Sequence, residues 1–454
     1  MTAAAQPDLA ALTAAVDAVL PATLVDLETL VAVPSISSMP EHAADVQRTA
    51  DLIADWLRDI GAASVEVVSE GGAPAVIAHF PGPDGTPTVC LYAHHDVQPP
   101  GDLSLWSTAP FSAAERGGRL YGRGSADDKG GVAVHLATLR AFGGKPPVGV
   151  KLFIEGEEEV GSPTLTRILD KHHDLLVADV FVIADSTNWE AGRPAFTTRL
   201  RGIADCVVEV RTLASGIHSG EYGGVVPDAL TALCRLLATL HDDAGNVAIE
   251  GLLSTKAPEL DYPLDRLAEE TGLVQGVAFI GDGSVVERIW TKPAVSVIAL
   301  DTTRIADASN TLIPAARAKV SLRVAPGQTA DEALGALIRH LESHAPWGAQ
   351  VTVTPGHTGQ PGIIDFEGAV CDSAFESMHE AFGVEPVFIG CGGSIPMVAE
   401  FQRTFPDATV LVTAVTDPTS AMHGIDESVQ LSDVRAAAVT EAGLLTRLAA
   451  AAGR

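Results

Sequence analysis

The stretch Leu91–Pro100, LYAHHDVQPP, joins the end of a predicted strand to a loop that contains histidine and aspartate. Its first residues end the apolar run TVCLYA, which is typical of a buried strand, and its two prolines prevent further pairing. His94 and Asp96 therefore follow the carboxyl end of a strand. An imidazole there can coordinate a transition metal, and a carboxylate two residues away can orient the ring. Because histidines in a loop are more often solvated, a metal site requires further ligands elsewhere in the chain.

Length and composition restrict the class of protein. A chain of 454 residues is longer than one ordinary core, and 46% hydrophobic with 19% charged residues is typical of a globular protein. The formal net charge of -29 argues against nucleic-acid or anionic-membrane partners. We expect no membrane span, because no apolar run of about 18 residues is found, and no signal peptide, because the N-terminus lacks a basic region. Five widely spaced cysteines favour reduced thiols and a cytoplasmic location.

Three apolar strands end in residues that can bind metal ions. TVCLYA leads to His94, GVKLFIE leads to the glutamates of EGEEEVG, and VFVIAD ends at Asp185. In open α/β sheets, ligands bind at the edge formed by the carboxyl ends of the strands. Polar residues after a single strand mark only the end of that strand, but three such strands favour a common site.

The chain changes character near residue 202. Residues 202–356 predict the order strand, helix, strand, strand, helix, strand, which is that of a split βαβ domain, although 243–289 has no clear pattern. Strands and helices alternate on both sides of this segment. The sequence therefore predicts an α/β fold in which a discontinuous catalytic domain, residues 1–201 and 357–454, carries a mixed, mostly parallel sheet between helices. An α+β domain, residues 202–356, is inserted into it.

Each remaining ligand candidate also has an ordinary structural explanation. The acidic pair that begins with Asp127 in ADDKGG suits a helix N-cap, but a carboxylate can also be shared by two cations. Glu158 and Glu159 suit a solvated turn. After a buried strand, however, one can coordinate a metal while the other, its pKa raised by burial and like charge, is a general base. Asp185 suits a turn cap or a terminal ligand, and His423 suits a solvated loop or a ligand at the same sheet edge.

Four motifs, found in the same order, carry a family resemblance. They are His-x-Asp-Val, GRG-x-x-Asp-Asp-Lys-Gly, Glu-Glu-x-Gly-Ser and a late His-x-x-x-Glu. Together they resemble the dinuclear-zinc metallopeptidase family twenty, that of carnosine dipeptidase, aminoacylase and succinyl-diaminopimelate desuccinylase, over nearly the whole chain. YAHHDVQP, GRGSADDKGG, EGEEEVGS, GIHSGEYGG and GGSIP are most similar to its cytosolic dipeptidase branch. The resemblance implies that the inserted domain is a lid and also forms the contact of a homodimer.

The resemblance also implies the metal ligands. Carried over by position, one divalent ion is held by His94, Asp127 and Asp185, and the second by Asp127, Glu159 and His423. Asp127 then bridges both ions, and the family pattern has a cis peptide bond after it. Histidine and carboxylate ligands suit Zn²⁺, which we expect, and also Mn²⁺ or Co²⁺.

Two further residues match catalytic positions of the family. Glu158 matches the general base, and Asp96 matches the carboxylate that orients His94. Two cations about 3.5–4 Å apart would lower the pKa of a water molecule between them. Glu158 would take the proton of this water and return it to the departing amine.

Three candidates lie in the inserted domain. His218 in GIHSGEYGG matches a family histidine that reaches the active site of the partner subunit. Arg323 in KVSLRVAP resembles the arginine that clamps a substrate carboxylate, and Asn310 is a further candidate for substrate contact. Without the resemblance, His218 is a surface loop residue and Arg323 belongs to an ordinary strand-end salt bridge.

The predicted function is hydrolysis of the amide bond of dipeptides or small peptides by a metal-bridged hydroxide with a glutamate base. Gly390 and Cys391 stand where the dipeptidase branch commonly has Arg-Glu before GGSIP, and an arginine there would help to recognise a carboxylate. Cys391 either fills space or lines the pocket. This departure leaves an N-acyl- or N-carbamoyl-amino-acid amidohydrolase as the alternative. A non-catalytic carboxylate-binding protein would require a broken site, and no ligand is missing.

Overall fold

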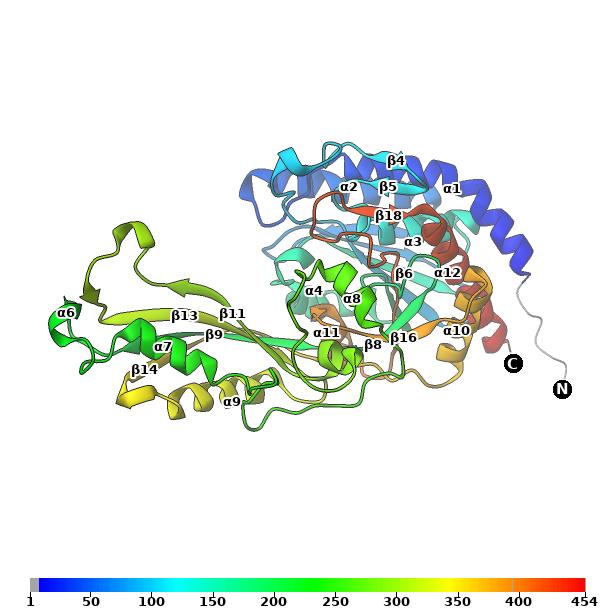
Figure 1. Ribbon diagram of the computed structural model, residues 1–454. Helices are drawn as coiled ribbons and strands as arrows, with labels where there is room; N and C mark the ends of the chain where they lie inside the picture. Colours follow the sequence, from blue (N-terminus) through cyan, green and yellow to red (C-terminus); the bar gives the residue numbers. More distant parts are fainter. Residues whose placement is uncertain (1–7, 394, 454) are drawn as a thin grey trace. The chain divides into compact units, whose positions relative to one another are not determined.

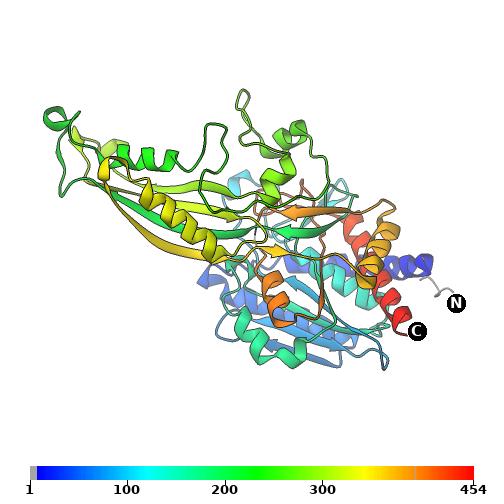
Figure 2. The ribbon, with the colours of Figure 1, turned by 90° about the horizontal axis from the view of Figure 1, so that it is seen from below.

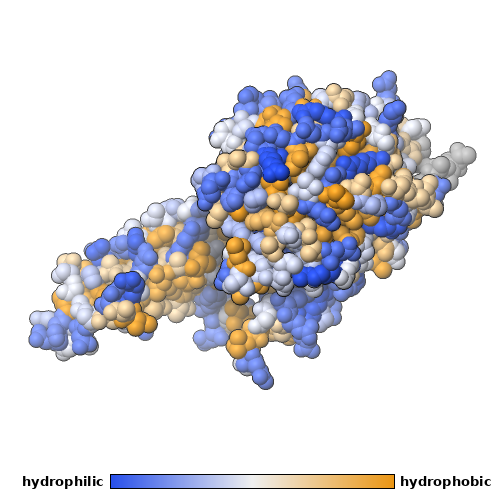
Figure 3. Space-filling model, turned by 90° about the horizontal axis from the view of Figure 1, so that it is seen from above, coloured by the Kyte–Doolittle hydropathy of each residue, from blue (hydrophilic) through white to orange (hydrophobic). Residues whose placement is uncertain are grey.

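The computed structural model describes residues 8–393 and 395–453, and Figures 1 and 2 show their helices and strands. The chain divides into two compact units. The first unit comprises the described residues of 1–198, 364–389 and 396–454, and the second comprises 199–363 with the described residues of 390–395. Over the face seen in Figure 3, hydrophilic residues are interspersed with smaller hydrophobic areas.

The first unit is built on a six-stranded sheet. Its strands, in spatial order, are β1 Ser64–Val68, β2 Ala75–Phe80, β6 Gly149–Glu155, β3 Thr88–His94, β7 Val180–Ile183 and β17 Thr409–Val412. β2 pairs antiparallel with both β1 and β6, whereas β6, β3, β7 and β17 pair parallel with their neighbours. The predicted mixed, mostly parallel sheet is therefore confirmed. Because the parallel strands point the same way, their carboxyl ends meet at one edge.

The helices of this unit are α1 Leu9–Val31, α2 Ala43–Ile60, α3 Lys129–Ala141, α4 Leu165–Lys171, α5 His173–Leu176, α10 Ala369–Phe382, α11 Pro396–Thr404 and α12 Leu431–Ala452. Of these, α2, α3, α5, α10 and α11 contact strands of the sheet. α3 is the most enclosed, since every residue from Lys129 to Leu139 is buried and α1, α12 and β3 surround it. Leu91, Leu152 and Leu445 belong to the apolar core that joins sheet and helices. α2 ends at Gly61, whose φ of 110° suits glycine.

The helix α1 is long and largely apolar. Among the described residues it is the one helix that could cross a membrane by length and composition, although Asp17 and Asp26 interrupt its apolar sequence. Core helices and signal sequences meet the same criterion. In the structure, Asp17 and Asp26 of α1 form ion pairs with Arg435 of α12 and Arg140 of α3. The N-terminal segment is expected not to be a signal peptide. Residues 1–7 of this segment lie outside the described residues.

The second unit contains a four-stranded antiparallel sheet and two helices packed on it. Their order along the chain is β9 Gly202–Arg211, α7 Ala229–Ala238, β11 Ala294–Asp301, β13 Ala315–Val324, α9 Ala330–Ser343 and β14 Gln350–Gly359. In space the strands lie in the order β11, β13, β9, β14, and all neighbours are antiparallel. This is the predicted split βαβ arrangement.

Short elements complete the description. In the second unit they are β10 Ile217–His218, α6 Ser219–Tyr222, α8 Leu264–Thr271, β12 Thr311–Leu312 and β15 Gly362–Ile363. In the first unit they are β4 Ala114–Arg116, β5 Arg119–Tyr121 and β18 Ser428–Gln430, whereas β8 Ala195–Leu200 and β16 Val387–Cys391 contain residues of both units. The helix α8 falls within 243–289, a range without a clear pattern of helix or strand in the sequence.

The two faces of the second unit's sheet differ in burial. On β13, Ala316, Ala318 and Val320 are buried in a core shared with α7 and α9. Successive side chains of a strand point to opposite faces, so the intervening residues, which include Arg317 and Arg323, lie on the face away from this core.

Candidate metal centre

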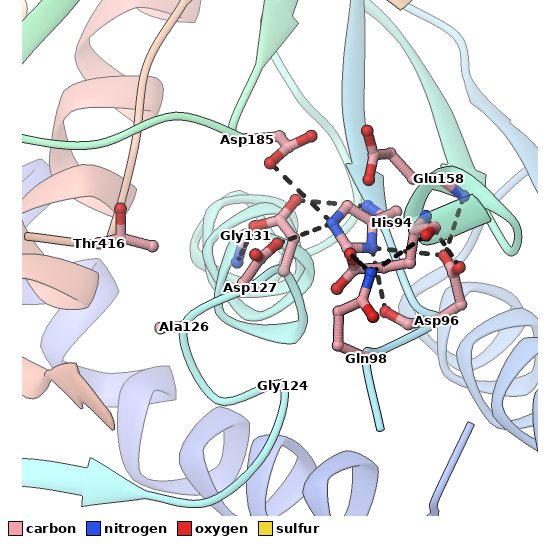
Figure 4. A network of polar contacts seen from close by, with 12 residues as sticks. His94, Asp96, Gln98, Gly124, Ala126, Asp127, Gly131, Glu158, Asp185 and Thr416 are labelled. Carbon is pink, nitrogen blue, oxygen red and sulfur yellow. Dashed lines mark hydrogen bonds and ion pairs between the residues drawn. The ribbon is translucent and has the colours of Figure 1, made fainter. Parts of the chain in front are cut away.

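His94 is the last residue of β3, and both of its ring nitrogens face polar groups (Figure 4). Nδ1 lies 3.0 Å from the backbone oxygen of Asp96. Because a carbonyl can only accept, Nδ1 carries a proton and donates it. Nε2 lies 2.9 Å from Asp127 Oδ1 and 3.9 Å from Asp185 Oδ1. In the neutral ring, the Nε2 lone pair therefore points toward carboxylate oxygens. Nε2 and these oxygens are then all electron-pair donors, and a metal cation between them would stabilise the arrangement.

Asp127 faces two histidines with its two oxygens. Oδ1 is directed toward His94, and Oδ2 lies 3.1 Å from Nε2 of His423. The same His423 nitrogen lies 3.1 Å from Glu159 Oε2. The peptide bond between Asp127 and Asp128 is cis, which confirms that part of the prediction. A ligand that bridges two metal ions requires this divergent arrangement of oxygens.

Two groups of three side chains could each hold a metal ion. They are His94, Glu158 and Asp185, and Asp127, Glu159 and His423; within each group the ligand atoms lie within 4.8 Å of one another. The structure thus brings together all five predicted ligands and the predicted base. They come from β3, from the loops after β6, β7 and β17, and from the segment that precedes α3. The division of these residues between metal coordination and proton transfer stays a prediction.

Asp96 connects three members of the centre. Its Oδ1 accepts a hydrogen bond from the backbone N–H of Glu158 at 3.2 Å, and its Oδ2 accepts one from Glu159 at 3.1 Å. Its backbone oxygen accepts from the ring of His94. The fully buried Asp96 therefore positions both glutamates as well as the histidine.

Glu427 is a functional candidate that the sequence analysis did not assign. Its Oε1 accepts hydrogen bonds from the N–H groups of Ala126 and Asp127, at 3.0 and 3.1 Å, and its Oε2 accepts one from Gly124 at 3.0 Å. Its carboxylate also pairs with the buried Arg123. Glu427 therefore fixes the main chain that presents Asp127. The motif His-x-x-x-Glu contains this residue, so the signal was present in the sequence.

Gln98 was also missed. Its Nε2 donates to Glu159 Oε2 at 2.9 Å and to the backbone oxygen of Glu159 at 3.1 Å. These bonds restrict the orientation of the Glu159 carboxylate. Gln98 lies in the motif YAHHDVQP, so its position was marked in the sequence, but its bond to Glu159 was not.

Asp128 and His95 have structural roles beside the centre. Asp128 Oδ1 accepts from Gly131 N at 3.2 Å and caps α3, so the N-cap interpretation holds for the second residue of the acidic pair. His95 Nε2 donates to Pro74 O at 2.9 Å, and burial lowers the pKa of His95 to about 4.

The electrostatics of the centre fit bound cations. Among the described residues, no lysine or arginine forms an ion pair with its four carboxylates. Burial, and then the charge of Asp185, raises the pKa of Glu158 well above its usual value. Burial likewise raises the pKa of Asp185, and hydrogen bonds with Asp127 and Glu159 raise the pKa of His423 to about 10. Two divalent cations would neutralise this excess of negative charge, so the donor set fits a dinuclear site.

The three candidates of the second unit lie on two separate parts of it. His218 and Asn310 are neighbours, because β10 pairs with β12 and Ser219 N donates to Asn310 O at 2.9 Å. Both residues are exposed. Arg323 is half-buried near the far end of β13, about 26 Å from the first residue of that strand at about 3.3 Å per residue. Within this unit, His218 and Arg323 therefore do not share one site.

Comparisons with known proteins define the class. Residues 90–447 match the family described as peptidase family M20/M25/M40, and the chain belongs to that family. The predicted resemblance is thereby confirmed. A cysteinylglycine-S-conjugate dipeptidase from Corynebacterium striatum is 34% identical over 427 residues, covering 92% of this chain and 94% of the relative. The beta-Ala-His dipeptidase of Rattus norvegicus is 29% identical, covering 81% and 80%.

Solved structures share the fold. The di-peptidase Dug1p from Saccharomyces cerevisiae superposes with a TM-score of 0.81 at 23% identity, covering 97% of this chain and 98% of that one. Human carnosine dipeptidase 1 also gives 0.81, at 24% identity and the same coverage. These likenesses confirm the predicted α/β fold. The family and the two ligand groups together support a site for two divalent metal ions.

Proposed function

We propose that this enzyme hydrolyses the amide bond of dipeptides or small peptides with two bound divalent metal ions. The observation that carries the proposal is Asp127, whose two oxygens face the histidines His94 and His423. Family membership supports peptide hydrolysis. The relatives described above are dipeptidases of cysteinylglycine conjugates and of beta-Ala-His, which supports a dipeptide as substrate.

The residues divide the chemistry between them. Two cations held by the predicted ligands would activate a water molecule and polarise the scissile carbonyl. Glu158 accepts the proton of this water, since it lies in the centre and is the one carboxylate there that is not among the predicted ligands. It then returns the proton to the departing amine. Asp96 keeps Glu158 and His94 in place during this transfer.

The second unit is proposed to be the lid and dimer contact, with predicted domain bounds of 202–356. In this proposal His218 serves the active site of the partner subunit, Arg323 binds the substrate carboxylate, and Asn310 makes a further substrate contact. The exposure of His218 and the lack of an acidic partner for Arg323 among the described residues support these roles. A cytoplasmic homodimer without nucleic-acid or membrane partners completes the proposal, supported by the net charge of -29 and five free cysteines.

The metal ions and the reaction can be tested together. Purified protein is stripped with a chelator and reloaded with Zn²⁺, Mn²⁺ or Co²⁺, and its metal content is measured beside hydrolysis of a dipeptide panel. We expect two equivalents of metal per chain, with Zn²⁺ as the native metal, and chelator-sensitive hydrolysis of at least one dipeptide. Hydrolysis of none, or hydrolysis at full rate without metal, would contradict the proposal.

One observation favours the second candidate, an N-acyl- or N-carbamoyl-amino-acid amidohydrolase. A Cβ atom at Gly390 would lie 2.5 Å from the Cβ of Trp290, so an arginine is not accommodated there without a shift of Trp290. Faster turnover of N-acyl or N-carbamoyl amino acids than of dipeptides with a free amine would favour this candidate.

A further inference from the structure

Arg201 and Arg323 of the second unit are half-buried arginines that lack an acidic partner among the described residues. Among the described residues, neither Arg201 nor Arg323 forms an ion pair, although acidic residues outnumber basic ones by 58 to 29 in this chain. Most arginines in so acidic a protein have a carboxylate within reach. Two neighbouring guanidinium groups that lack one therefore require an explanation.

Arg201 is held in place by neutral groups only. Its backbone N–H donates to Cys391 O at 3.1 Å, and its Nε donates to Gly392 O at 3.2 Å. Its Nη1 donates to the backbone oxygens of Arg288 and Lys292, at 3.3 and 3.5 Å. These bonds fix the orientation of the guanidinium and leave its charge uncompensated. Its Nη2 makes no hydrogen bond within the described residues.

The strand register places Arg323 beside Arg201. Arg323 of β13 lies opposite Ile203 of β9. Arg201 precedes Ile203 by two residues, and in an extended chain residues two apart point to the same face of the sheet. Arg201 and Arg323 are therefore diagonal neighbours, whose Cα atoms are expected about 7–8 Å apart. Burial, and then the charge of Arg323, lowers the pKa of Arg201 to about 10, as expected for two nearby cations.

A carboxylate bound between Arg201 and Arg323 would offset the repulsion between their charges. Like charges that are partly removed from water repel each other, and an anion between them replaces the missing counter-ion. The planar guanidinium donates two parallel hydrogen bonds to a carboxylate. Arg323 has all of its donors available within the described residues, and Arg201 has its Nη2. The segment beside Arg201 is Gly390–Gly393, where Trp290 excludes an additional arginine side chain.

We infer that Arg201 is a specificity-determining residue that binds the free carboxylate of the substrate together with Arg323. This inference rests on the proposed function and narrows its substrate class. Substrates with a free C-terminal carboxylate are hydrolysed efficiently, and the corresponding C-terminal amides are not.

The test compares a dipeptide with its C-terminal amide. Values of kcat/KM are measured for wild type, Arg201→Gln, Arg201→Lys and the control Arg317→Gln. Arg317 lies on the same strand and face as Arg323 but pairs with Asp301 on the surface. In Arg201→Gln, we expect kcat/KM to fall about 10- to 100-fold for the acid and less than about threefold for the amide. Arg201→Lys should lose most of the preference for the acid over the amide, since a lysine cannot donate two parallel hydrogen bonds to a carboxylate. The control Arg317→Gln should keep this preference.

Two results would overturn the inference. One is an unchanged kcat/KM for the acid in Arg201→Gln. The other is an equal loss for both substrates, which would mean that Arg201 only supports the main chain around Gly392.

A binding measurement separates this inference from the proposed function. Metal-free wild type and Arg201→Gln are melted with and without glutarate, and glutaramide serves as the neutral probe. We expect glutarate to raise the melting temperature of the wild type alone. This result would stand even if no dipeptide were hydrolysed, a failure that would concern the proposed function. Equal glutarate shifts in both proteins, or none in either, would overturn the inference.

Discussion

The carboxyl edge of the six-stranded sheet and the antiparallel sheet of the second unit present their predicted functional residues differently. At the first, side chains from separate segments meet, and His94 Nε2 lies 2.9 Å from Asp127 and 3.9 Å from Asp185. In the second, His218 and Arg323 lie on separate parts of one unit. Parallel strands end at a common edge, whereas antiparallel strands send successive loops to opposite ends. The first unit thus assembles a ligand set, and the second offers separate binding groups.

The largest effect is expected where the ligand groups meet. Asp127→Asn removes the charge that faces both histidines, so we expect metal content to fall below one equivalent per chain and activity to fall below detection. Metal analysis and dipeptide hydrolysis are the measurements. Asp84→Asn, in an exposed loop, is the matched control. Two equivalents of metal retained by Asp127→Asn would show that this carboxylate is not the bridge.

Glu158→Gln, at the same edge of the six-stranded sheet, should separate metal binding from the catalytic step. The variant keeps the size of the side chain but loses the base, so we expect kcat to fall about 10³-fold while both metal ions stay bound. Metal content and kcat are measured together, and Glu66→Gln, on an exposed position of β1, should change neither. If kcat stays within tenfold of the wild type, the base lies elsewhere.

His218→Ala tests the other side of the comparison. His218 is exposed, and its one described side-chain hydrogen bond is with Gly220 N, so the free energy of unfolding should change by less than about 0.5 kcal/mol. If His218 completes the site of a partner subunit, kcat should fall about 100-fold, as for loss of one oxyanion donor.

A mixing experiment shows whether His218 acts across subunits. His218→Ala and Glu158→Gln are combined under conditions that exchange subunits, and a mixed dimer should contain one intact site. We therefore expect activity that neither variant has alone. A mixture no more active than its components would argue against a shared site.

Glu427→Gln should weaken the first unit itself. It leaves the buried Arg123 without its carboxylate and loosens the main chain at Asp127. We expect the free energy of unfolding to fall by about 3 kcal/mol, measured by urea titration. A change below about 0.5 kcal/mol would mean that the buried pair contributes little and that Glu427 does not fix the loop.

Gln98→Ala should give the smallest effect. It removes one hydrogen bond from the Glu159 carboxylate and leaves all predicted ligands in place. We expect metal affinity to fall about tenfold, as is typical for residues that hydrogen-bond to a metal ligand without contacting the metal. The value of kcat at saturating metal should stay nearly unchanged. Metal titration of the stripped protein measures this effect, and unaltered affinity would exclude such a role.

The same contrast explains what could be predicted from the sequence. His94, Asp127 and Glu159 stand in motifs at strand or helix ends, and the structure brings them together as predicted. The motif His-x-x-x-Glu marks Glu427, but its bonds to backbone N–H groups about 300 residues away could not be predicted from local spacing. The acidic pair of ADDKGG predicted a helix N-cap, which Asp128 provides for α3. The eight residues of α8 form about two turns, too few to show a clear period in the sequence.

Anomalous X-ray diffraction from metal-loaded crystals would show whether two cations share the carboxylate of Asp127. We expect two anomalous peaks, one on the His94 side and one on the His423 side, each within coordination distance of an Asp127 oxygen. A single peak, or two peaks that Asp127 does not contact, would contradict this expectation.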